Sequence, residues 1–229
     1  MADTSEILQG YVKLTEFLGQ VLGPDYEVVF HDLTDPNHSI IAIVNGHISG
    51  RKVGAPLTNV ALSVIKDKGY ENEDYRVNDY GLSASGRQLR SNTLFIKHEG
   101  KLIGMLCINF DDSRYREATE KIMSLAHPLN FYESEFLEKT PSEFAADITE
   151  KYNSSSEGVA ADAIQKELEK MGVSAERLTA EERMKVIAAL EEQGIFLLKG
   201  VVKDVAMGLK CSQASVYRYM SQLKIGGVS

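Results

Sequence analysis

The fold of this chain is decided by its C-terminal stretch KGVVKDVAMGLKCSQASVYRYMSQLK, residues 199–224. Apolar residues recur there at intervals of three and four, at positions 202, 205, 206 and 209 and again at 216, 219, 220 and 223. This spacing gives each of two short helices one apolar face. Lys210, Cys211 and Ser212 separate the helices, and the hydroxyl of Ser212 can cap the second one. The pattern predicts a helix-turn-helix.

The outer face of the second helix carries side chains suited to reading DNA. Glutamine and arginine form paired hydrogen bonds with base edges, and alanine can touch a thymine methyl group. Flanking lysines can neutralise phosphates, which positions a domain without specifying sequence. An ordinary helical hairpin also has a polar outer face, but the break, the cap and the flanking charge together favour DNA binding. Lys210 is unusual, because such turns generally carry a glycine in the left-handed conformation. The candidate DNA-binding residues are Lys199, Lys203, Ser212, Gln213, Ala214, Ser215, Tyr217, Arg218 and Lys224.

Charge is distributed unevenly along the chain. The formal net charge is −8, yet residues 199–229 contain five Lys or Arg and one Asp or Glu, a local charge of +4. The segment with DNA-reading geometry is therefore basic in an otherwise acidic protein. This segregation favours a local DNA-contacting face over a general affinity for polyanions.

Composition bounds the class of protein. With 229 residues, of which 43% are hydrophobic, the chain can form one large or two small domains. No apolar run approaches the ~18 residues of a membrane span. Residues 1–6 lack the basic-then-apolar order of a signal peptide. Cys107 and Cys211 form neither a zinc motif nor a disulfide framework. We expect a cytoplasmic protein with no membrane contact.

The front part of the chain mixes helical and strand-like segments. Apolar residues at positions 7, 11, 14, 18 and 21 predict a helix over residues 4–22, which Gly23 and Pro24 end. Strand-like segments follow at 26–31, 39–44, 75–82, 90–98 and 102–110, with a helix near 57–68 and a hairpin turn at 98–101. These elements predict an α+β domain, an antiparallel sheet with helices on one face.

The remainder divides into a connector and a helical domain. Residues 133–176 form a predicted acidic helical connector, and residues 152–158 are its expected flexible joint. Thr179 and Glu182 have the spacing of a capping box, which begins a helix that ends near Gly194. The expected domains are residues 1–132 (the α+β domain with its N-terminal helix), 133–176 (the connector) and 177–229 (the helix-turn-helix domain).

Several segments resemble a known family. They are HDL (31–33), IVNGHISGRKVGAPLT (43–58), LFIK (94–97), GMLCIN (104–109) and the run from 194 to 219. Together they resemble the YheO-like transcriptional regulators over both domains, from about residue 6 to residue 223. The resemblance implies a PAS-like sensor domain followed by an all-α helix-turn-helix domain. Some relatives regulate D-arginine utilisation, which implies a small amino-acid-like effector.

Catalytic, metal and cofactor chemistry has weak support in the residues. Cys107 could act as a nucleophile beside a histidine, but it lies in an apolar strand, where cysteine usually serves as a small hydrophobic residue. The histidines at positions 31, 38, 47, 98 and 127 lack zinc-ligand spacing. No glycine-rich phosphate loop follows a strand, and no haem or flavin motif is present. We expect no enzyme activity, no metal and no cofactor.

A ligand site is expected in the front domain instead. Residues 45–54 contain three glycines that permit close backbone approach, and Arg51 offers a fork of donors suited to a carboxylate. Polar residues in otherwise apolar strands can converge on a pocket. The alternative is a simple turn in which Arg51 pairs with an acidic residue of the fold. The candidate ligand-binding residues are Arg51, Asn45, Ser91, Thr93 and Asn109.

These observations predict a sequence-specific, DNA-binding transcriptional regulator with a small-molecule sensor. One helix-turn-helix covers only a few base pairs, so specific binding needs two copies on half-sites about 34 Å apart. We therefore expect a homodimer on double-stranded DNA. Two alternatives stay open: a small-molecule-binding protein whose helical tail binds a protein partner, and an enzyme with an accessory domain.

Overall fold

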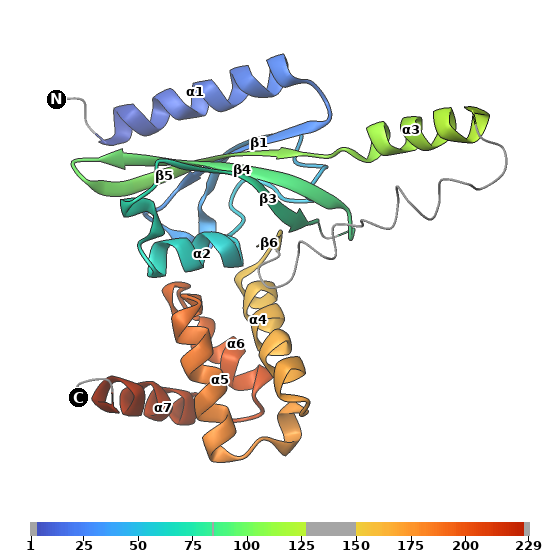
Figure 1. Cartoon of the computed structure of the whole chain (residues 1–229). Coiled ribbons are helices and arrows are strands. Elements are labelled where there is room, and N and C mark those ends of the chain that lie inside the picture. Colours follow the sequence, from blue (N-terminus) through green and yellow to red (C-terminus); the bar gives the residue numbers. More distant parts are fainter. Residues whose placement is uncertain (1–3, 84, 127–149, 227–229) are drawn as a thin grey trace.

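The computed structural model describes residues 4–83, 85–126 and 150–226, without the side chains of 126 and 224–226. A sheet domain at the N-terminal end sits above a bundle of helices at the C-terminal end, and one helix, α2, lies between them (Figure 1). The predicted order, an α+β part followed by an all-α part, is confirmed. Within the described ranges, no helix combines the length and apolar character needed to cross a membrane.

The N-terminal domain is built on a sheet of six strands in the order β2-β1-β5-β4-β3-β6. The strands are β1 (Tyr26–Asp32), β2 (Ile40–Val44), β3 (Tyr75–Leu82), β4 (Gln88–His98), β5 (Lys101–Phe110) and β6 (Glu150–Lys151). Neighbouring strands are antiparallel except β3 and β6, which run parallel. Glu99 and Gly100 join β4 to β5 with φ values of 50° and 75°. The predicted hairpin is therefore confirmed.

Helices cover both faces of this sheet, not one face as the sequence predicted. The helices of this part of the chain are α1 (Thr4–Leu22), η1 (Pro36–His38), α2 (Asn59–Lys66), η2 (Gly69–Glu71) and α3 (Ser113–Ala126), of which α3 extends away from the end of the sheet. α1 packs on the outer face against Val28, Phe30 and Leu106, whereas α2 lies under the inner face against Phe95 and Met105 (Figure 1). The strands are apolar on both sides, so their alternation did not reveal that both faces are covered.

The C-terminal region packs around one hydrophobic cluster. Its helices are α4 (Ser156–Met171), η4 (Ala175–Arg177), α5 (Ala180–Glu192), η5 (Ile195–Leu197), α6 (Val201–Gly208) and α7 (Gln213–Gly226). α5 begins with the predicted capping box. The Glu182 N–H donates to Thr179 Oγ1 at 3.2 Å, and the Thr179 N–H donates to Glu182 Oε2 at 2.7 Å. That prediction is confirmed.

α4 is part of this bundle. Val159, Ile164 and Leu168 of α4 are buried in the same cluster as Val186 and Leu190 of α5. The packed core therefore crosses the boundary that the sequence placed between residues 176 and 177. An acidic helix can still bury one apolar stripe, and here that stripe decides where the helix belongs.

The flexible joint predicted at residues 152–158 is wrong. Tyr152 is only 3% exposed. Ser155 caps α4, because its Oγ accepts a hydrogen bond from the Gly158 N–H at 3.1 Å. The serine-rich composition of this segment is typical of a linker, but one of its serines caps a helix and its tyrosine is buried.

α2 also contacts the helical bundle. Leu57, just before α2, and Leu62 within it are buried in the bundle's hydrophobic cluster. Lys66 Nζ lies 2.8 Å from Glu191 Oε1 of α5. The backbone of Gly194, with φ 74°, approaches α2 so closely that a Cβ atom there would lie 2.8 Å from the Leu62 carbonyl oxygen. The two domains therefore share a packed contact centred on α2.

Candidate DNA-binding surface and buried cavity

The turn between α6 and α7 has the geometry that the sequence predicted. Lys210 adopts the left-handed conformation with φ 50°, so a lysine holds the position that usually carries glycine. The Cys211 N–H donates to the Ala206 carbonyl at 3.0 Å. Ser212 Oγ accepts from the Ser215 N–H at 3.1 Å and caps α7. The predicted helix-turn-helix and its cap are confirmed.

The exposed face of α7 consists mostly of polar side chains. Gln213, Ala214, Arg218 and Ser221 are exposed and Tyr217 is 56% exposed. On the opposite side, Val216 and Tyr219 are buried against α5 and α6. The Arg218 guanidinium lies 5.2 Å from the centre of the Tyr219 ring. This contact reduces the freedom of the arginine, which favours directional binding of its donors.

The lysines predicted to contact phosphates are in different environments. Lys203 is exposed on α6. Lys199 lies at the contact between the domains, where its N–H donates to Asn37 Oδ1 at 2.7 Å and its Nζ is 3.8 Å from Asp35 Oδ1. The side chain of Lys224 falls outside the described residues. Of the two lysines whose side chains the structure describes, Lys203 is available for a phosphate without leaving a partner.

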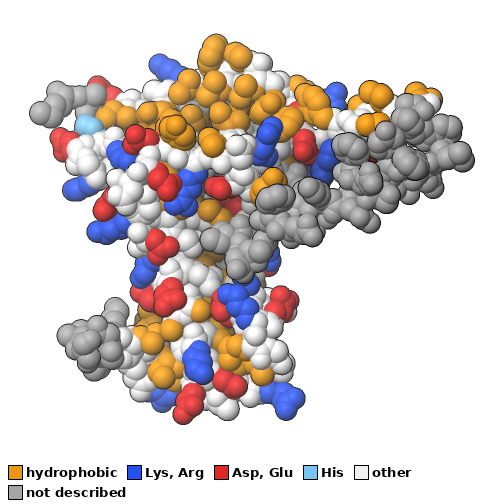
Figure 2. Space-filling view, viewed as in Figure 1, with side chains coloured by type: hydrophobic (Ala, Val, Ile, Leu, Met, Phe, Trp, Pro, Cys, Tyr) orange, Lys and Arg blue, Asp and Glu red, His pale blue; other side chains and the backbone are white. Residues whose placement is uncertain are grey.

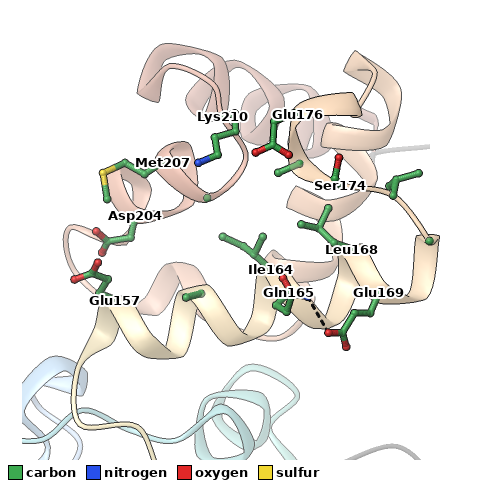
Figure 3. Close-up of a pocket in the computed structure, with 15 residues that line it drawn as sticks. Glu157, Ile164, Gln165, Leu168, Glu169, Ser174, Glu176, Asp204, Met207 and Lys210 are labelled. Carbon is green, nitrogen blue, oxygen red and sulfur yellow. Dashed lines mark hydrogen bonds between the residues drawn. The ribbon is translucent and has the colours of Figure 1, made fainter.

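A groove with an acidic rim runs between α4 and α6 (Figure 3). Its volume is about 680 Å³. Ile164 and Leu168 form part of an apolar floor, and the carboxylates of Glu157 and Asp204 point toward one another across one end (Figure 3). Negative charge at the rim repels phosphates, so this groove is not the surface that meets the DNA backbone.

A second, smaller cavity lies in the sheet domain between α2 and the inner face of the sheet. Its volume is about 20 Å³, room for roughly one water molecule. Apolar side chains from α2 and from the sheet form part of the wall. The lining residues are His31, Thr58, Val60, Ala61, Val64, Arg76, Asp79, Thr93, Phe95, Met105, Cys107 and Glu150. Polar and apolar groups thus line the same small space.

A buried hydrogen-bond network continues from this cavity. Asn109 Nδ2 donates to Glu27 Oε1 at 2.8 Å, and Ser91 Oγ donates to Asn109 Oδ1 at 2.9 Å. Ser49 Oγ donates to Glu27 Oε2 at 2.6 Å. The hydroxyl oxygen of Tyr152 lies 3.1 Å from Asn109 Oδ1. Burial raises the pKa of Glu27, and the hydrogen bonds from Ser49 and Asn109 oppose that shift.

Arg51 is buried beside this network. It is 3% exposed, and one of its terminal nitrogens donates to the Pro56 carbonyl. Its Nε has no hydrogen-bond partner in the part of the chain that the structure describes. Burial lowers the pKa of Arg51, and the carboxylates of Glu150 and Glu27 oppose that shift, Glu150 more strongly. An unsatisfied buried donor is unfavourable, and a carboxylate is the group that best satisfies an arginine.

Four of the five predicted ligand residues lie in or next to this region. Ser91 and Asn109 belong to the network, and Thr93 lines the cavity with its Oγ1 3.5 Å from Cys107 Sγ. Asn45 does not join them. Its Nδ2 donates to the carbonyls of Gly23 and Tyr26 at 3.0 and 2.8 Å, so it braces a turn at another corner of the domain.

Sequence reasoning missed three residues of the region. Glu27 is a carboxylate in a buried apolar strand, which is a detectable signal. Thr58 and Glu150 carry no comparable signal, because they meet only in the folded chain. Thr58 Oγ1 donates to Glu150 Oε1 at 2.6 Å across 92 positions of sequence.

The titratable groups of the cavity do not form a reactive pair. Burial raises the pKa of the Cys107 thiol to about 12, so it is protonated at neutral pH. Burial, and then the charge of Arg51, lowers the pKa of His31 well below its usual range. His31 Nδ1 is 2.9 Å from Ser39 Oγ, and that buried hydroxyl is also 3.4 Å from the Ala55 carbonyl oxygen. Among the described residues, no group of three or more His, Cys, Asp or Glu side chains could hold a metal ion.

Two family models match the chain. The YheO-like PAS domain model matches residues 2–127, and an HTH domain model matches residues 159–221. The chain is 28% identical over 222 residues to the Escherichia coli K12 protein YheO, which covers 96% of this chain and 86% of the relative. It is 30% identical over 222 residues to a Haemophilus influenzae protein, with 95% and 91% covered. It is also similar to the transcriptional regulator DauR of Pseudomonas aeruginosa, 26% identical over 223 residues with 96% of each chain covered. Both matched domains are of regulator type, and neither indicates a catalytic family.

Proposed function

The protein belongs to the YheO-like PAS domain family, since that match covers more than half of its residues, and from this premise we propose that it is a sequence-specific transcriptional regulator acting in the cytoplasm. The observation that carries the proposal is the exposed face of α7. Gln213 and Arg218 offer paired donors and acceptors to base edges, and Tyr217 and Ser221 extend the same face. The capped turn before α7 fixes how this face is presented.

The proposal is tested by selecting a binding site from random DNA and measuring affinity for it at several salt concentrations. Gln213→Ala and Arg218→Ala should each cost about 1–3 kcal/mol on the selected site and relax preference at one base position. Lys203→Ala should weaken selected and random DNA alike and reduce the salt slope by about 0.9. Lys101→Ala, at the exposed β4–β5 turn, is the control and should bind as the parent does. If Gln213→Ala and Arg218→Ala both bind like the parent, α7 is not the reading helix.

The active species in this proposal is a homodimer formed through α1. Leu14, Phe17 and Val21 are 37%, 61% and 62% exposed along one stripe of α1. Apolar side chains gather over this helix in the space-filling view (Figure 2). A large exposed apolar patch indicates an interface, and DNA recognition calls for a second copy. Phe17→Glu should therefore yield a monomer in sedimentation with weakened operator binding. Glu16→Lys, an exposed position about 100° around α1 from Phe17, should remain a dimer.

The region around Arg51 and the small cavity of the sheet domain is the proposed site for a small amino-acid-like effector, and the cavity, with room for roughly one water molecule, must widen to admit it. Arg51 would pair with its carboxylate, and Ser91, Thr93 and Asn109 offer further polar contacts. A ligand that prefers one arrangement of the domains shifts DNA affinity by its differential binding, typically about 1–3 kcal/mol. Amino acids would be screened by thermal shift on the full chain. Arg51→Lys keeps the charge without the fork of donors, so it should lose the effector response and keep operator binding. An unchanged response in that variant rules Arg51 out as the partner.

The acidic groove favours a second candidate function, contact with another protein. Glu157, Glu169, Glu176 and Asp204 at the rim outnumber the one cation, Lys210. An apolar floor between carboxylates fits a basic amphipathic helix. A labelled helical peptide with a leucine face and lysine flanks should bind the full chain, and a glutamate-flanked version should not. Asp204→Lys should weaken that binding, and Glu181→Lys, outside the groove, should leave it intact.

A further inference from the structure

The helix α3 carries an apolar stripe that is open to solvent. Tyr115, Ala118, Ile122 and Leu125 recur at intervals of three and four, so they share one face of the helix. All residues from 114 to 125 are exposed, and the exposed fractions of Ile122 and Leu125 are 65% and 86%. A free helix of this length is marginal in water, and packing of its apolar face is what usually stabilises it. The stripe of α3 therefore calls for a partner surface.

The first turn of α3 is fixed to the end of the sheet. The Ser113 N–H donates to Asp111 Oδ1 at 3.0 Å. One terminal nitrogen of Arg114 lies 2.9 Å from a carboxylate oxygen of Asp25, and the ring of Tyr115 lies 5.5 Å from that of Phe110, the last residue of β5. The rest of α3 extends beyond the sheet (Figure 1). Its second half, with Ile122 and Leu125, therefore lies away from its own sheet.

The outer face of the sheet has a second open apolar surface, beside α1. Directly opposed residues of neighbouring strands share a face, and the register leads from Leu106, which packs with α1, to Leu94 and then to Tyr75. α1 contacts β1, β2 and β5. Beyond it, Leu94 is 37%, Tyr75 63% and Val77 56% exposed. Val77 follows Tyr75 by two positions in β3 and so points to the same side. Tyr75, Val77 and Leu94 are called the β3–β4 surface below.

The β3–β4 surface has the width of one helix. Neighbouring strands lie about 4.8 Å apart, and a helix with its side chains is about 10 Å across, so two strands offer room for one helix next to α1. Among the α-helices that the structure describes, α3 is the one without a buried residue in its described positions 113–125. One chain thus presents both an apolar helix without a partner and an apolar surface of matching width.

We propose that α3 of a second copy packs on the β3–β4 surface, and that two copies exchange these helices reciprocally. The inference deepens the proposed homodimer through α1 and rests on it. An interface of standard size buries about 800 Å² per partner, and the three exposed apolar residues of α1 are few for that area. Apolar side chains gather on the upper side of the molecule, where α1 and α3 lie (Figure 2). A two-fold exchange covers the stripe of α3 and the β3–β4 surface in both copies, because each copy presents both.

Disulfide formation between two full chains of different size tests the exchange. One chain carries Ile122→Cys on α3. The other carries a mass tag and a cysteine in place of Tyr75, Val77 or Leu94, so that the three variants sample the β3–β4 surface. Mild oxidation of the mixture should give a product of the mixed size with at least one of them. A mixture of tagged and untagged parent chains, which contain Cys107 and Cys211, measures the background.

The matched control lies on the other side of the same helix. Glu120 is exposed and stands about 200° around α3 from Ile122. Glu120→Cys should give no mixed product above the background with any of the three partners. Absence of a mixed product with Ile122→Cys, or equal products with Ile122→Cys and Glu120→Cys, overturns the inference.

The dissociation constant of the dimer gives an independent measure. In sedimentation, Ile122→Glu should raise this constant by roughly a hundredfold, because a two-fold interface contains each substitution twice. Ser124→Glu, at an exposed position also about 200° around α3 from Ile122, should dimerise like the parent. If Phe17→Glu is monomeric and Ile122→Glu dimerises like the parent, the exchange is wrong and the proposed homodimer through α1 stands. A monomeric parent overturns both, so the two failures are distinguishable.

Discussion

Gly194→Ala should separate the sheet domain from the helical bundle. Gly194 has φ 74°, and its position next to α2 leaves no room for a methyl group. A Cβ atom there would lie 2.8 Å from the Leu62 carbonyl oxygen and 3.2 Å from Lys66 Cβ. The carbonyl oxygen belongs to the backbone of α2 and cannot rotate away. The strain is therefore relieved only by movement of α2 or of the bundle.

The magnitude has two parts. An alanine in the left-handed conformation costs about 1–2 kcal/mol relative to glycine, and overpacking a filled contact costs about 1–3 kcal/mol more. Gly172→Ala isolates the first part, because Gly172 has φ 66° and a Cβ atom added there would meet no atom within 4 Å. In urea unfolding, Gly194→Ala should therefore lose about 1–3 kcal/mol more free energy of unfolding than Gly172→Ala.

Limited proteolysis of both variants would show whether the loss concerns the contact between the domains. Gly194→Ala should be cleaved faster than the parent, and Gly172→Ala should be cleaved at the rate of the parent. Equal free energies of unfolding and equal cleavage in the two variants would refute the close approach of Gly194 to α2.

Three further predictions follow from local geometry. Lys210→Gly should raise the free energy of unfolding by about 1 kcal/mol, because the backbone of Lys210 is left-handed. Lys203→Gly within α6 should lower the free energy of unfolding by about as much. Equal effects of the two changes in urea unfolding would contradict this prediction. The pKa of His31 in the folded chain lies well below its usual 6.5, so the folded state prefers the neutral ring. The free energy of unfolding should therefore fall as the pH drops below 6.5, by up to about 1.4 kcal/mol per pH unit. That slope should vanish in His31→Asn. Gly81→Ala places a Cβ atom 2.5 Å from the Tyr152 ring, so it should speed exchange of the Tyr152 amide, and an unchanged rate would count against this packing.

The helix-turn-helix could be predicted because its determinants are local. The apolar stripe of α7, the break and the Ser212 cap all lie within a few residues of one another. Lys210, which stands where such turns usually carry glycine, was recognised as unusual from the same local rules. The structure shows that this lysine itself adopts the left-handed conformation. Short-range patterns fix short-range geometry.

The cavity could be predicted only in part because its determinants are distant in sequence. Arg51 was visible as a fork of donors in a glycine-rich segment, and Asn109 as a polar residue in an apolar strand. Asn45 shared the same glycine-rich segment, but its amide satisfies two carbonyls of a turn. Glu150 comes from beyond residues 133–149 of the predicted connector, and no periodicity in the chain indicates that it returns to the sheet. Long-range contacts of this kind leave no local pattern to read.

The position of α2 links the PAS domain and the HTH domain by direct contact. Val60 and Val64 face the cavity, and Leu62 lies in the hydrophobic cluster of the helical bundle. One helix is thus a wall of both compartments, and its N-terminal cap, Thr58, is bonded to the carboxylate of Glu150. Packed interiors deform in discrete steps because they contain little free volume. A ligand too large for the present cavity must therefore move part of its wall, and two elements of that wall, α2 and β6, are in contact with the domain that carries α7.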